Sequence, residues 1–272
     1  MMINFGRTRH SLSTRKIARS LGAHRHSYKI EYHSTLASTN DLAKEQASGG
    51  AENGRVVIAD RQTAGRGRMG RSFYSPAGNG IYMSVILKPE RPIADTAGVT
   101  TFCAVCVSNA INALYGVSSQ IKWVNDVLLS GKKVCGILAE GKPCTDQSGF
   151  EYVVLGIGIN VSPSPFPEEI SGIAASLESF SDARPCRAQI IAEVLKNLSP
   201  LLSGDLPDGF MDVYRSRSLL LGKEVRTLSS PALCGVAEDI ADDGALIIRS
   251  SDGTLHRIIA GEVSVRATDS PD

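Results

Sequence analysis

The sequence predicts an α+β fold, with a mixed domain over residues 30–218 and a small β-barrel over residues 219–268. Before residue 218, short apolar runs typical of strands alternate with segments of helical periodicity. After it, only short strand candidates follow, and Asp-Gly pairs at 243–244 and 252–253 separate them as tight turns. A chain of 272 residues is long enough for one sizeable core and a second small domain.

The elements of the first domain are expected in a definite order. Ser38 is an N-cap candidate for a short helix through LAKEQA, because its hydroxyl can accept from a free backbone N–H of the first turn. The proline-rich segment 162–169 is expected to be a loop. The other elements are strands at 55–60 and 80–88, a helix at 95–115, a hairpin turning at 130–132, a strand at 152–161 and a helix at 187–203.

The composition is that of an ordinary globular protein. Hydrophobic residues make up 42% and charged residues 21%, and the net charge of +1 excludes a general polyanion binder. No apolar run approaches the roughly 20 residues that span a bilayer, so we expect no membrane partner. The six cysteines are scattered, which is typical of a reducing compartment and predicts a cytoplasmic location. Cys103 and Cys106 lie in an apolar helix pattern and are interpreted as core residues, not zinc ligands.

Residues 1–29 are basic, with seven Lys or Arg and no acidic residue. We predict a linker or a short helix, over LSTRKIARSL, ahead of the first domain. An Arg-rich, acid-poor segment is also typical of a transit peptide, and composition alone leaves that alternative open.

The segment RQTAGRGRMGR, residues 61–71, is the most informative part of the chain. Glycine allows a close backbone approach to a ligand, and arginine offers a planar fork of donors that suits phosphate and carboxylate. The two types alternate here, at Gly65, Arg66, Gly67, Arg68, Gly70 and Arg71. The segment lacks the Walker A pattern, and its GxGxxG spacing opens no evident helix. We predict a phosphate-bearing ligand; an RG-rich nucleic-acid-binding segment is the alternative.

Two further clusters accompany this segment. KWVND, residues 122–126, places a cation, an amide and a carboxylate at the end of an apolar strand. The hairpin that follows carries KKVCGIL, residues 132–138, which offers Lys133 as a cation that can neutralise charge on a phosphate. In GIGIN, Gly156 and Gly158 lie on one face of a strand, where the missing side chains leave room for a flat ligand or a close backbone.

Together, these motifs resemble the biotin protein ligase family, in the form without an N-terminal winged helix-turn-helix. The matching stretches are STN at 38–40, RQTAGRGRMGR at 61–71, KWVND at 122–126, KKVCGIL at 132–138, GIGINV at 156–161 and the C-terminal GEVSVR. The resemblance implies a class II synthetase-like mixed sheet flanked by helices, with an SH3-like barrel behind it. It also implies two reaction steps. Biotin and MgATP give biotinyl-5'-AMP, and a lysine of a biotin carboxyl carrier domain of a carboxylase then takes the biotinyl group.

The resemblance also implies roles for particular residues. Lys133, Arg68 and Asp126 would be catalytic, with Lys133 as the main cation and Asp126 orienting or deprotonating the incoming lysine. The implied biotin-binding residues are Ser38, Thr39, Asn40, Gln62, Gly65, Arg66, Gly67, Arg68, Lys133 and Gly136. The implied ATP and adenylate residues are Arg66, Arg68, Arg71, Phe73, Asn125, Lys133 and Asn160. Mg²⁺ would come with the ATP phosphates and needs no protein site. Phe73 stands where the family often has tryptophan, and Val124 replaces a frequent proline.

Other functions stay open. A lipoate or octanoate ligase shares the catalytic fold, although it lacks the GRGR segment in this form. A biotin-responsive DNA-binding repressor needs roughly 60 residues for its winged helix-turn-helix. Only residues 1–29 precede the ligase-like region, so we expect no specific DNA binding. An RNA-binding protein needs more stacking aromatics than Phe73 and Tyr74 beside the loop. The resemblance leaves monomer and homodimer both open.

Overall fold

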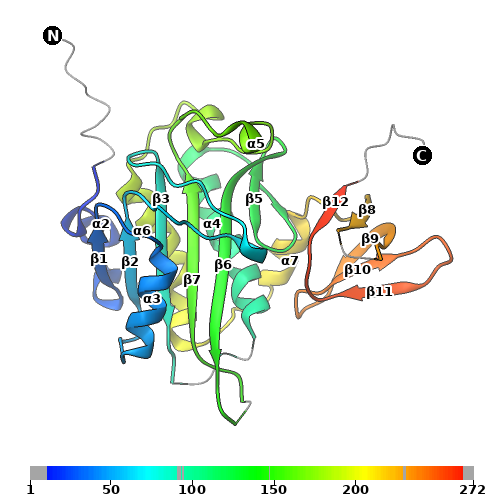
Figure 1. Ribbon diagram of the computed structural model, residues 1–272, viewed down its shortest axis with the longest axis horizontal. Coiled ribbons are helices and arrows are strands. Elements are labelled where there is room, and N and C mark those ends of the chain that lie inside the picture. Colours follow the sequence, from blue (N-terminus) through cyan, green and yellow to red (C-terminus); the bar gives the residue numbers. More distant parts are fainter. Residues whose placement is uncertain (1–10, 91–92, 94, 147, 229–230, 266–272) are drawn as a thin grey trace.

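A seven-stranded mixed sheet organises the larger part of the computed structural model (Figure 1), which describes residues 11–90, 93, 95–146, 148–228 and 231–265. The strand order is β1-β2-β3-β7-β6-β5-β4, with β1 and β2 parallel and the other neighbours antiparallel. The strands are β1 Lys29–His33, β2 Arg55–Ala59, β3 Gly80–Leu87, β4 Gln120–Lys122, β5 Asp126–Leu129, β6 Lys132–Pro143 and β7 Phe150–Asn160.

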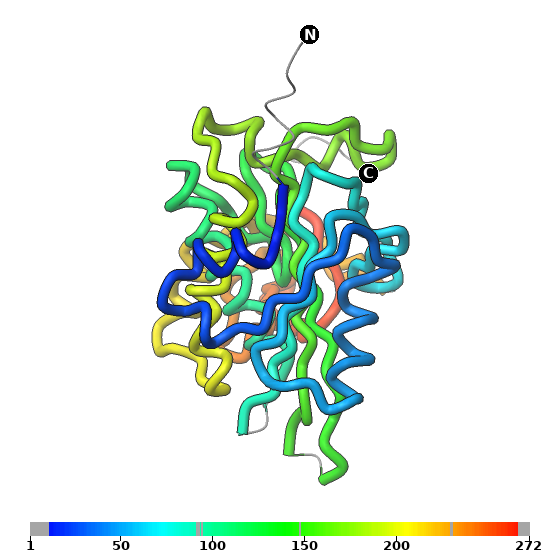
Figure 2. Tube along the Cα trace, turned by 90° about the vertical axis from the view of Figure 1, so that its left-hand side faces the viewer, coloured from blue at the N-terminus to red at the C-terminus, as the bar shows by residue number. Residues whose placement is uncertain are grey.

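Helices cover both faces of this sheet (Figure 2). The helices and 3₁₀ turns are α2 Thr14–Leu21, η1 Gly22–Ser27, α3 Thr39–Ser48, η2 Arg68–Gly70, α4 Thr96–Tyr115, α5 Glu168–Ser171, η3 Leu177–Ser179, α6 Arg187–Leu198, η4 Ser199–Ser203 and α7 Phe210–Ser216. Helix α3 packs on one face against β2, β3 and β7, while α4 and α6 pack together on the other. Each face therefore has its own apolar core, and under α3 Ala43 and Ala47 lie against Val57, Ile86 and Val154.

Helix α4 is the central helix of the larger core. Asp95 caps its N-terminus by accepting from Gly98 N at 2.6 Å, and Gly116 ends it in the left-handed conformation. By length and composition α4 could cross a membrane, but 72% of its apolar window is buried inside the protein. Cys103 and Cys106 are buried in it, as expected of core residues.

Turn and helix-end chemistry explains the limits of two predicted elements. The hairpin turns at Ser130 and Gly131, whose φ values of 47° and 76° suit a two-residue loop between twisted strands. The helix predicted over 187–203 ends at Leu198. Because Pro200 has no N–H to donate, the chain continues there as the 3₁₀ turn η4.

Residues 11–28 belong to the folded domain. Ser13 caps α2, and Ile17 and Leu21 of that helix are 0% and 1% exposed and join the large core, where α2 packs against α6. The i, i+4 spacing of these two apolar residues is the signal of a helix with one buried face. The structure thus has a helix here, but as part of the core and not as a linker. Residues 1–10 lie outside the described residues.

A second, five-stranded antiparallel sheet forms the C-terminal part (Figure 1). Its order is β11-β10-β9-β8-β12, from β8 Glu224–Thr227, β9 Cys234–Ile240, β10 Leu246–Arg249, β11 Leu255–Ile258 and β12 Val263–Val265. Trp123 Nε1–H donates to Gly244 O at 2.8 Å, so this buried ring joins the two sheets. The predicted fold class, a mixed sheet flanked by helices with a small β domain behind it, is confirmed. Residues 266–268 of the predicted barrel lie outside the described residues.

Candidate active site

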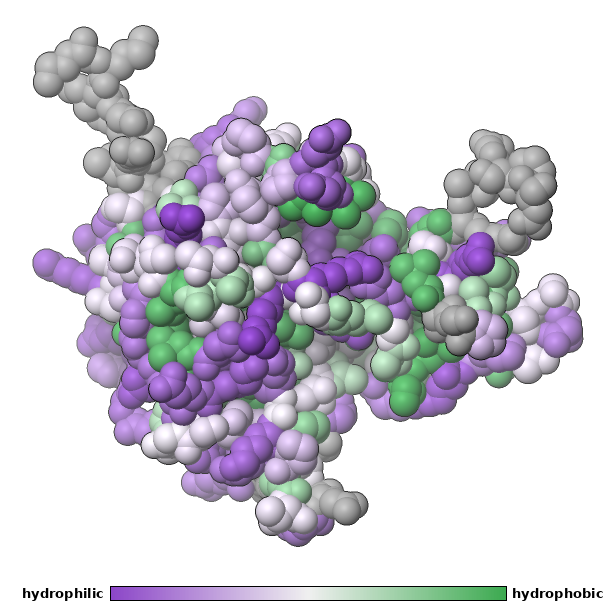
Figure 3. Space-filling model, in the orientation of Figure 1, coloured by the Kyte–Doolittle hydropathy of each residue, from purple (hydrophilic) through white to green (hydrophobic). Residues whose placement is uncertain are grey.

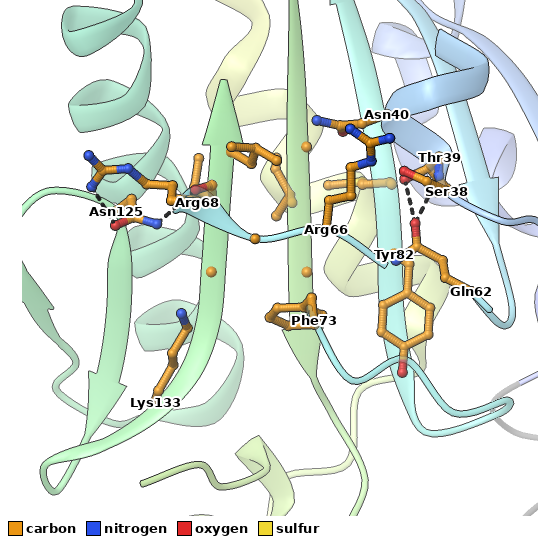
Figure 4. A pocket seen from close by; sticks show the side chains of 18 residues that line it. Ser38, Thr39, Asn40, Gln62, Arg66, Arg68, Phe73, Tyr82, Asn125 and Lys133 are labelled. Atoms are coloured by element: carbon orange, nitrogen blue, oxygen red, sulfur yellow. Dashed lines mark hydrogen bonds between the residues drawn. The ribbon is translucent and has the colours of Figure 1, made fainter. Parts of the chain in front are cut away.

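Two adjoining cavities lie where the segment 61–75 crosses strands β3, β7 and β6, and Figure 4 shows the side chains that line the inner one. The inner cavity, of about 470 Å³, is bounded by the start of α3, this segment and the glycine-rich parts of β6 and β7. The outer cavity, of about 840 Å³, extends from the same segment toward α5 and the second sheet. The two cavities share Gly67, Arg68, Phe73, Asn125 and Lys133 in their walls.

The polar end of the inner cavity begins at the N-terminus of α3. Ser38 caps this helix, and Ser38, Thr39 and Asn40 are each 4% exposed. The Thr39 backbone N–H donates to Gln62 Oε1 at 2.8 Å, and Gln62 Nε2 donates to Ser75 Oγ at 3.0 Å. The STN motif therefore supplies buried polar groups whose positions are held by hydrogen bonds, which suits recognition of a small polar ring.

Three glycines form the floor of the inner cavity. Gly136 and Gly158 are partners across β6 and β7, and Gly156 lies one step along the same face. A Cβ on Gly158 would lie 2.5 Å from the Phe73 ring, and one on Gly156 would collide with the Asn40 side chain. The room that the sequence predicted at Gly156 and Gly158 is thus used by two side chains that line the cavity.

The glycine-arginine segment, residues 65–71, is a tight backbone hairpin. Gly67 N–H donates to Arg71 O at 2.7 Å, and Phe73 N–H donates to Gly65 O at 2.9 Å. A Cβ on Gly65 would lie 2.5 Å from Phe73 O, so this crossing requires glycine. Gly65 lines neither cavity, unlike the other predicted site residues, and its contribution is this close backbone approach.

Two arginines fasten the segment to opposite sides of the cavities. Arg66 Nε lies 3.1 Å from Asp41 Oδ2 on α3. Arg71 Nη2 lies 2.6 Å from Glu262 Oε2, which precedes β12 in the second sheet. The tip between them, at Met69, is 71% exposed. The segment is therefore held at both ends by ion pairs while its tip faces solvent.

Lys133 and Arg68 bring two cations to the junction of the cavities. Lys133 Nζ lies 2.7 Å from Asp126 Oδ1, and Arg68 Nη1 donates to Asn125 Oδ1 at 3.2 Å. Asn125 Nδ2 donates to Ile137 O at 2.8 Å, which turns the amide oxygen toward Arg68. Two cations held by short polar contacts can stabilise negative charge that develops on a phosphate or a carboxylate.

The outer cavity has an apolar wall that the sequence did not reveal. Its predicted members, Arg71, Asp126 and Asn160, share the cavity with Tyr74, Phe166, Ile170 and Ile173. The Tyr74 and Phe166 rings meet edge to face, with centroids 6.2 Å apart. Lys133 N–H donates to Ile173 O at 2.8 Å, so this wall is attached to the strand that carries the lysine. Ile170 lies in the four-residue helix α5 and Ile173 lies beyond its end, so no helical periodicity marked these two residues in the sequence.

The comparisons with known proteins match both parts of the chain. Residues 32–160 match the biotin/lipoate A/B protein ligase family, and residues 220–266 match the biotin protein ligase C-terminal domain. The bifunctional ligase/repressor BirA of Bacillus subtilis strain 168 is 35% identical over 240 residues, which cover 86% of this chain and 73% of the relative. The biotin–[acetyl-CoA-carboxylase] ligase of Mycobacterium tuberculosis is 34% identical over 244 residues, which cover 83% and 85%. The solved biotin protein ligase from Aquifex aeolicus in complex with biotin and ATP is similar with a TM-score of 0.75 at 29% identity, over 88% of this chain and 99% of that one.

Proposed function

This chain belongs to the biotin protein ligase family, a family of ATP-dependent ligases, and on that premise we propose that it joins biotin to a protein lysine through an acyl-adenylate. In the first step, a biotin carboxylate oxygen attacks the α-phosphorus of ATP, and the bond from that phosphorus to pyrophosphate breaks. In the second step, the lysine amine attacks the acyl carbon of biotinyl-5'-AMP, AMP leaves, and the amine gives up a proton. Mg²⁺ accompanies ATP as part of the substrate.

The observation that carries this proposal is the junction of two unlike cavities at Lys133 and Arg68. The inner cavity has a hydrogen-bonding end that suits the ureido ring of biotin, and the outer cavity has an apolar wall that suits a flat base. A carboxylate reaching from the first and a phosphate reaching from the second would meet beside the two cations. Proximity and charge neutralisation of this kind lower the barrier to an in-line attack.

The proposed roles of single residues follow this division. On the biotin side we place Ser38, Thr39, Asn40, Gln62, Gly65, Arg66, Gly67 and Gly136. On the adenylate side we place Arg71, Phe73, Asn125 and Asn160. Lys133 and Arg68 contact both substrates at the point of reaction. The glycine-arginine segment keeps water from the mixed anhydride, which would otherwise hydrolyse.

Asp126 has a proposed part in each step. Its ion pair holds Lys133 in place before the substrates bind. When Lys133 turns to the phosphate, the carboxylate of Asp126 is released and can accept a proton from the incoming lysine amine.

The carrier is proposed to be a biotin carboxyl carrier domain, because relatives are named for ligation of acetyl-CoA carboxylase. A lipoate ligase is the second candidate, since the matched family includes lipoate ligases. The buried polar groups of Thr39 and Asn40 favour biotin, because the dithiolane ring of lipoate offers them no N–H or C=O.

Mass spectrometry of a carrier domain incubated with this protein, biotin and MgATP tests the proposal. We expect a gain of one biotinyl group on one lysine, and no gain when ATP is omitted or when lipoate replaces biotin. Biotin-dependent release of pyrophosphate, measured without carrier, tests the first step alone. An unmodified carrier together with no release of pyrophosphate would overturn the proposal.

A further inference from the structure

Asn40 is held from three strands at once. Its Nδ2 donates to Glu140 Oε2 of β6 at 2.8 Å. The Ser84 hydroxyl of β3 donates to its Oδ1 at 2.5 Å. Gly156 of β7 lies under the amide, and any side chain there would displace it. Ser84 is fully buried, and Asn40 points into the inner cavity beside Thr39 (Figure 4).

These contacts allow a single orientation of the Asn40 amide. An ionised carboxylate can only accept hydrogen bonds, so Glu140 requires Nδ2 to face β6. The oxygen Oδ1 must then face Ser84, whose hydroxyl can either donate or accept and adapts to it. Glu140 is therefore the one group of the three that dictates which end of the amide lies where.

Glu140 is kept charged by its surroundings. Lys44, one turn after Asn40 on α3, places Nζ 2.7 Å from Glu140 Oε1. Burial alone would raise the pKa of the Glu140 carboxyl, yet the hydrogen bonds from Lys44 and Asn40 and nearby cations hold that pKa below its usual value. The carboxylate is therefore ionised, and acceptor-only, at neutral pH.

The surface of this cluster is polar and partly open. Figure 3 shows hydrophilic side chains over the α3 side of the large sheet, where Lys44 and Asp41 lie 3.3 Å apart. Lys44 and Glu140 are about 30% and 28% exposed, so water screens their attraction and the pair adds little to stability. The Asn40 amide is strongly oriented, whereas the Lys44–Glu140 ion pair beside it is a modest stabiliser. We infer that these residues serve to orient the amide more than to stabilise the fold.

We propose that Glu140 is a positioning residue that selects a ligand ring with both hydrogen-bond donors and acceptors, such as a cyclic urea, by fixing the orientation of Asn40. Lys44 keeps the carboxylate charged and in place. Ser84 and Gly156 complete the socket around the amide. This inference rests on the proposed function for the identity of the ring, whereas the orientation of Asn40 stands without it.

A charge-reversed pair separates orientation from structural support. Glu140→Lys combined with Lys44→Glu keeps an ion pair but puts a donor-only group beside Asn40, which turns the amide around. In Glu140→Gln, the new side-chain amide can accept or donate a hydrogen bond, so both orientations of the Asn40 amide become available. The matched control is Lys142→Glu combined with Glu151→Lys, which reverses an exposed ion pair between β6, the strand that carries Glu140, and its neighbour β7.

Calorimetry then gives the dissociation constants for biotin, desthiobiotin and ATP. We expect the reversed pair at 44 and 140 to weaken biotin binding by about tenfold or more, since a turned amide leaves a buried polar group of the ring without its partner. Glu140→Gln should weaken it by about twofold, because half of the population is then misoriented. Desthiobiotin keeps the ureido ring, so its affinity should fall by the same factors as that of biotin. The affinity for ATP should stay within about twofold of the wild type. Biotin binding within twofold of the wild type in the reversed pair, or a parallel loss of ATP binding, would overturn the inference.

The side-chain amide of Asn40 gives a readout that needs no ligand. In the ¹⁵N-labelled protein without biotin, one Asn40 amide proton should be shifted downfield by its carboxylate acceptor. That shift should disappear in the reversed pair and persist in the control at 142 and 151. If the wild type fails to bind biotin but this pattern is found, the ring assignment fails with the proposed function while the positioning role stands. An unchanged amide signal in the reversed pair would overturn the positioning role itself.

Discussion

Lys133 Nζ lies 2.7 Å from Asp126 Oδ1 across the β5–β6 hairpin, at the junction of the two cavities. Lys133→Gln removes the cation that would face the reacting carboxylate and α-phosphate. We expect biotin-dependent pyrophosphate release to fall by roughly 100- to 1000-fold, because charge that develops in the transition state loses its partner. Biotin binding should change much less, since the polar end of the inner cavity is intact. Lys132→Gln is the control, because the Lys132 ammonium donates to Gly172 O at the protein surface. An equal loss of pyrophosphate release in Lys132→Gln would contradict the role assigned to Lys133.

Arg68→Gly removes the hydrogen bond that Arg68 Nη1 of the glycine-arginine segment donates to Asn125 Oδ1 at 3.2 Å. The segment should then open more often, because ordering each residue costs on the order of 1–2 kcal/mol and one of its fixed contacts is gone. Biotinyl-5'-AMP should escape and label bystander proteins. Rapid filtration of protein with labelled biotin and ATP measures the fraction of intermediate retained. Retention equal to the wild type would count against a closing role for this segment.

Glu262→Gln weakens the ion pair that ties Arg71 to the second sheet, where the two side chains lie 2.6 Å apart. The pair is partly exposed, so we expect only a two- to fivefold rise in KM for ATP, about what an exposed pair is worth. The difference from the wild type should shrink as salt is raised, because screening removes the same interaction. Glu238→Gln breaks the pair with Arg249 inside the second sheet and is the control. A salt-independent effect would argue for a different cause.

Local signals predicted most of the fold. Short apolar runs marked β2, β3 and β7, the turn at Ser130 and Gly131 marked the β5–β6 hairpin, and Ser38 marked the start of α3. Each of these features depends on residues that are close in sequence. The helix over LSTRKIARSL was one of two predicted readings, but its docking was not predictable locally, because Ile17 and Leu21 pack against α6, which is more than 160 positions away in sequence.

The surroundings of Asn40 could not be predicted in the same way. Ser84 and Glu140 lie 44 and 100 positions away in sequence and become its neighbours only when β3 and β6 enter one sheet. The same holds for Gly158, where the sequence indicated free space but not that Phe73 would fill it. Motifs therefore located the residues of the site, while their mutual contacts depended on long-range strand order.

Arg187 is 2% exposed and lies 2.7 Å from Asp60 Oδ1, at the end of β2. Its Nη1 also donates to Gly80 O at the start of β3, so one side chain joins both ends of the segment that carries the glycine-arginine hairpin. Arg187→Met should lower the free energy of unfolding by about 3 kcal/mol, because the Asp60 charge loses its buried partner. Urea titration measures the change. Adding Asp60→Leu should recover part of the loss, and a fully additive double variant would contradict the coupling.

Acid should uncouple Glu140 from its partners. The folded-state pKa of Glu140 lies below the usual 4.5, so its stabilising contribution is fully present above that pH and is lost as the pH falls through the lower folded value. The unfolding free energies of the wild type and Glu140→Gln should therefore differ most near neutrality and converge as the pH is lowered below about 4.5. Urea titrations across that range measure the convergence. Glu151→Gln, at an exposed pair on the neighbouring strand, should show a much smaller change. A gap that widens on acidification would mean that folding raises the pKa of this carboxyl instead of lowering it.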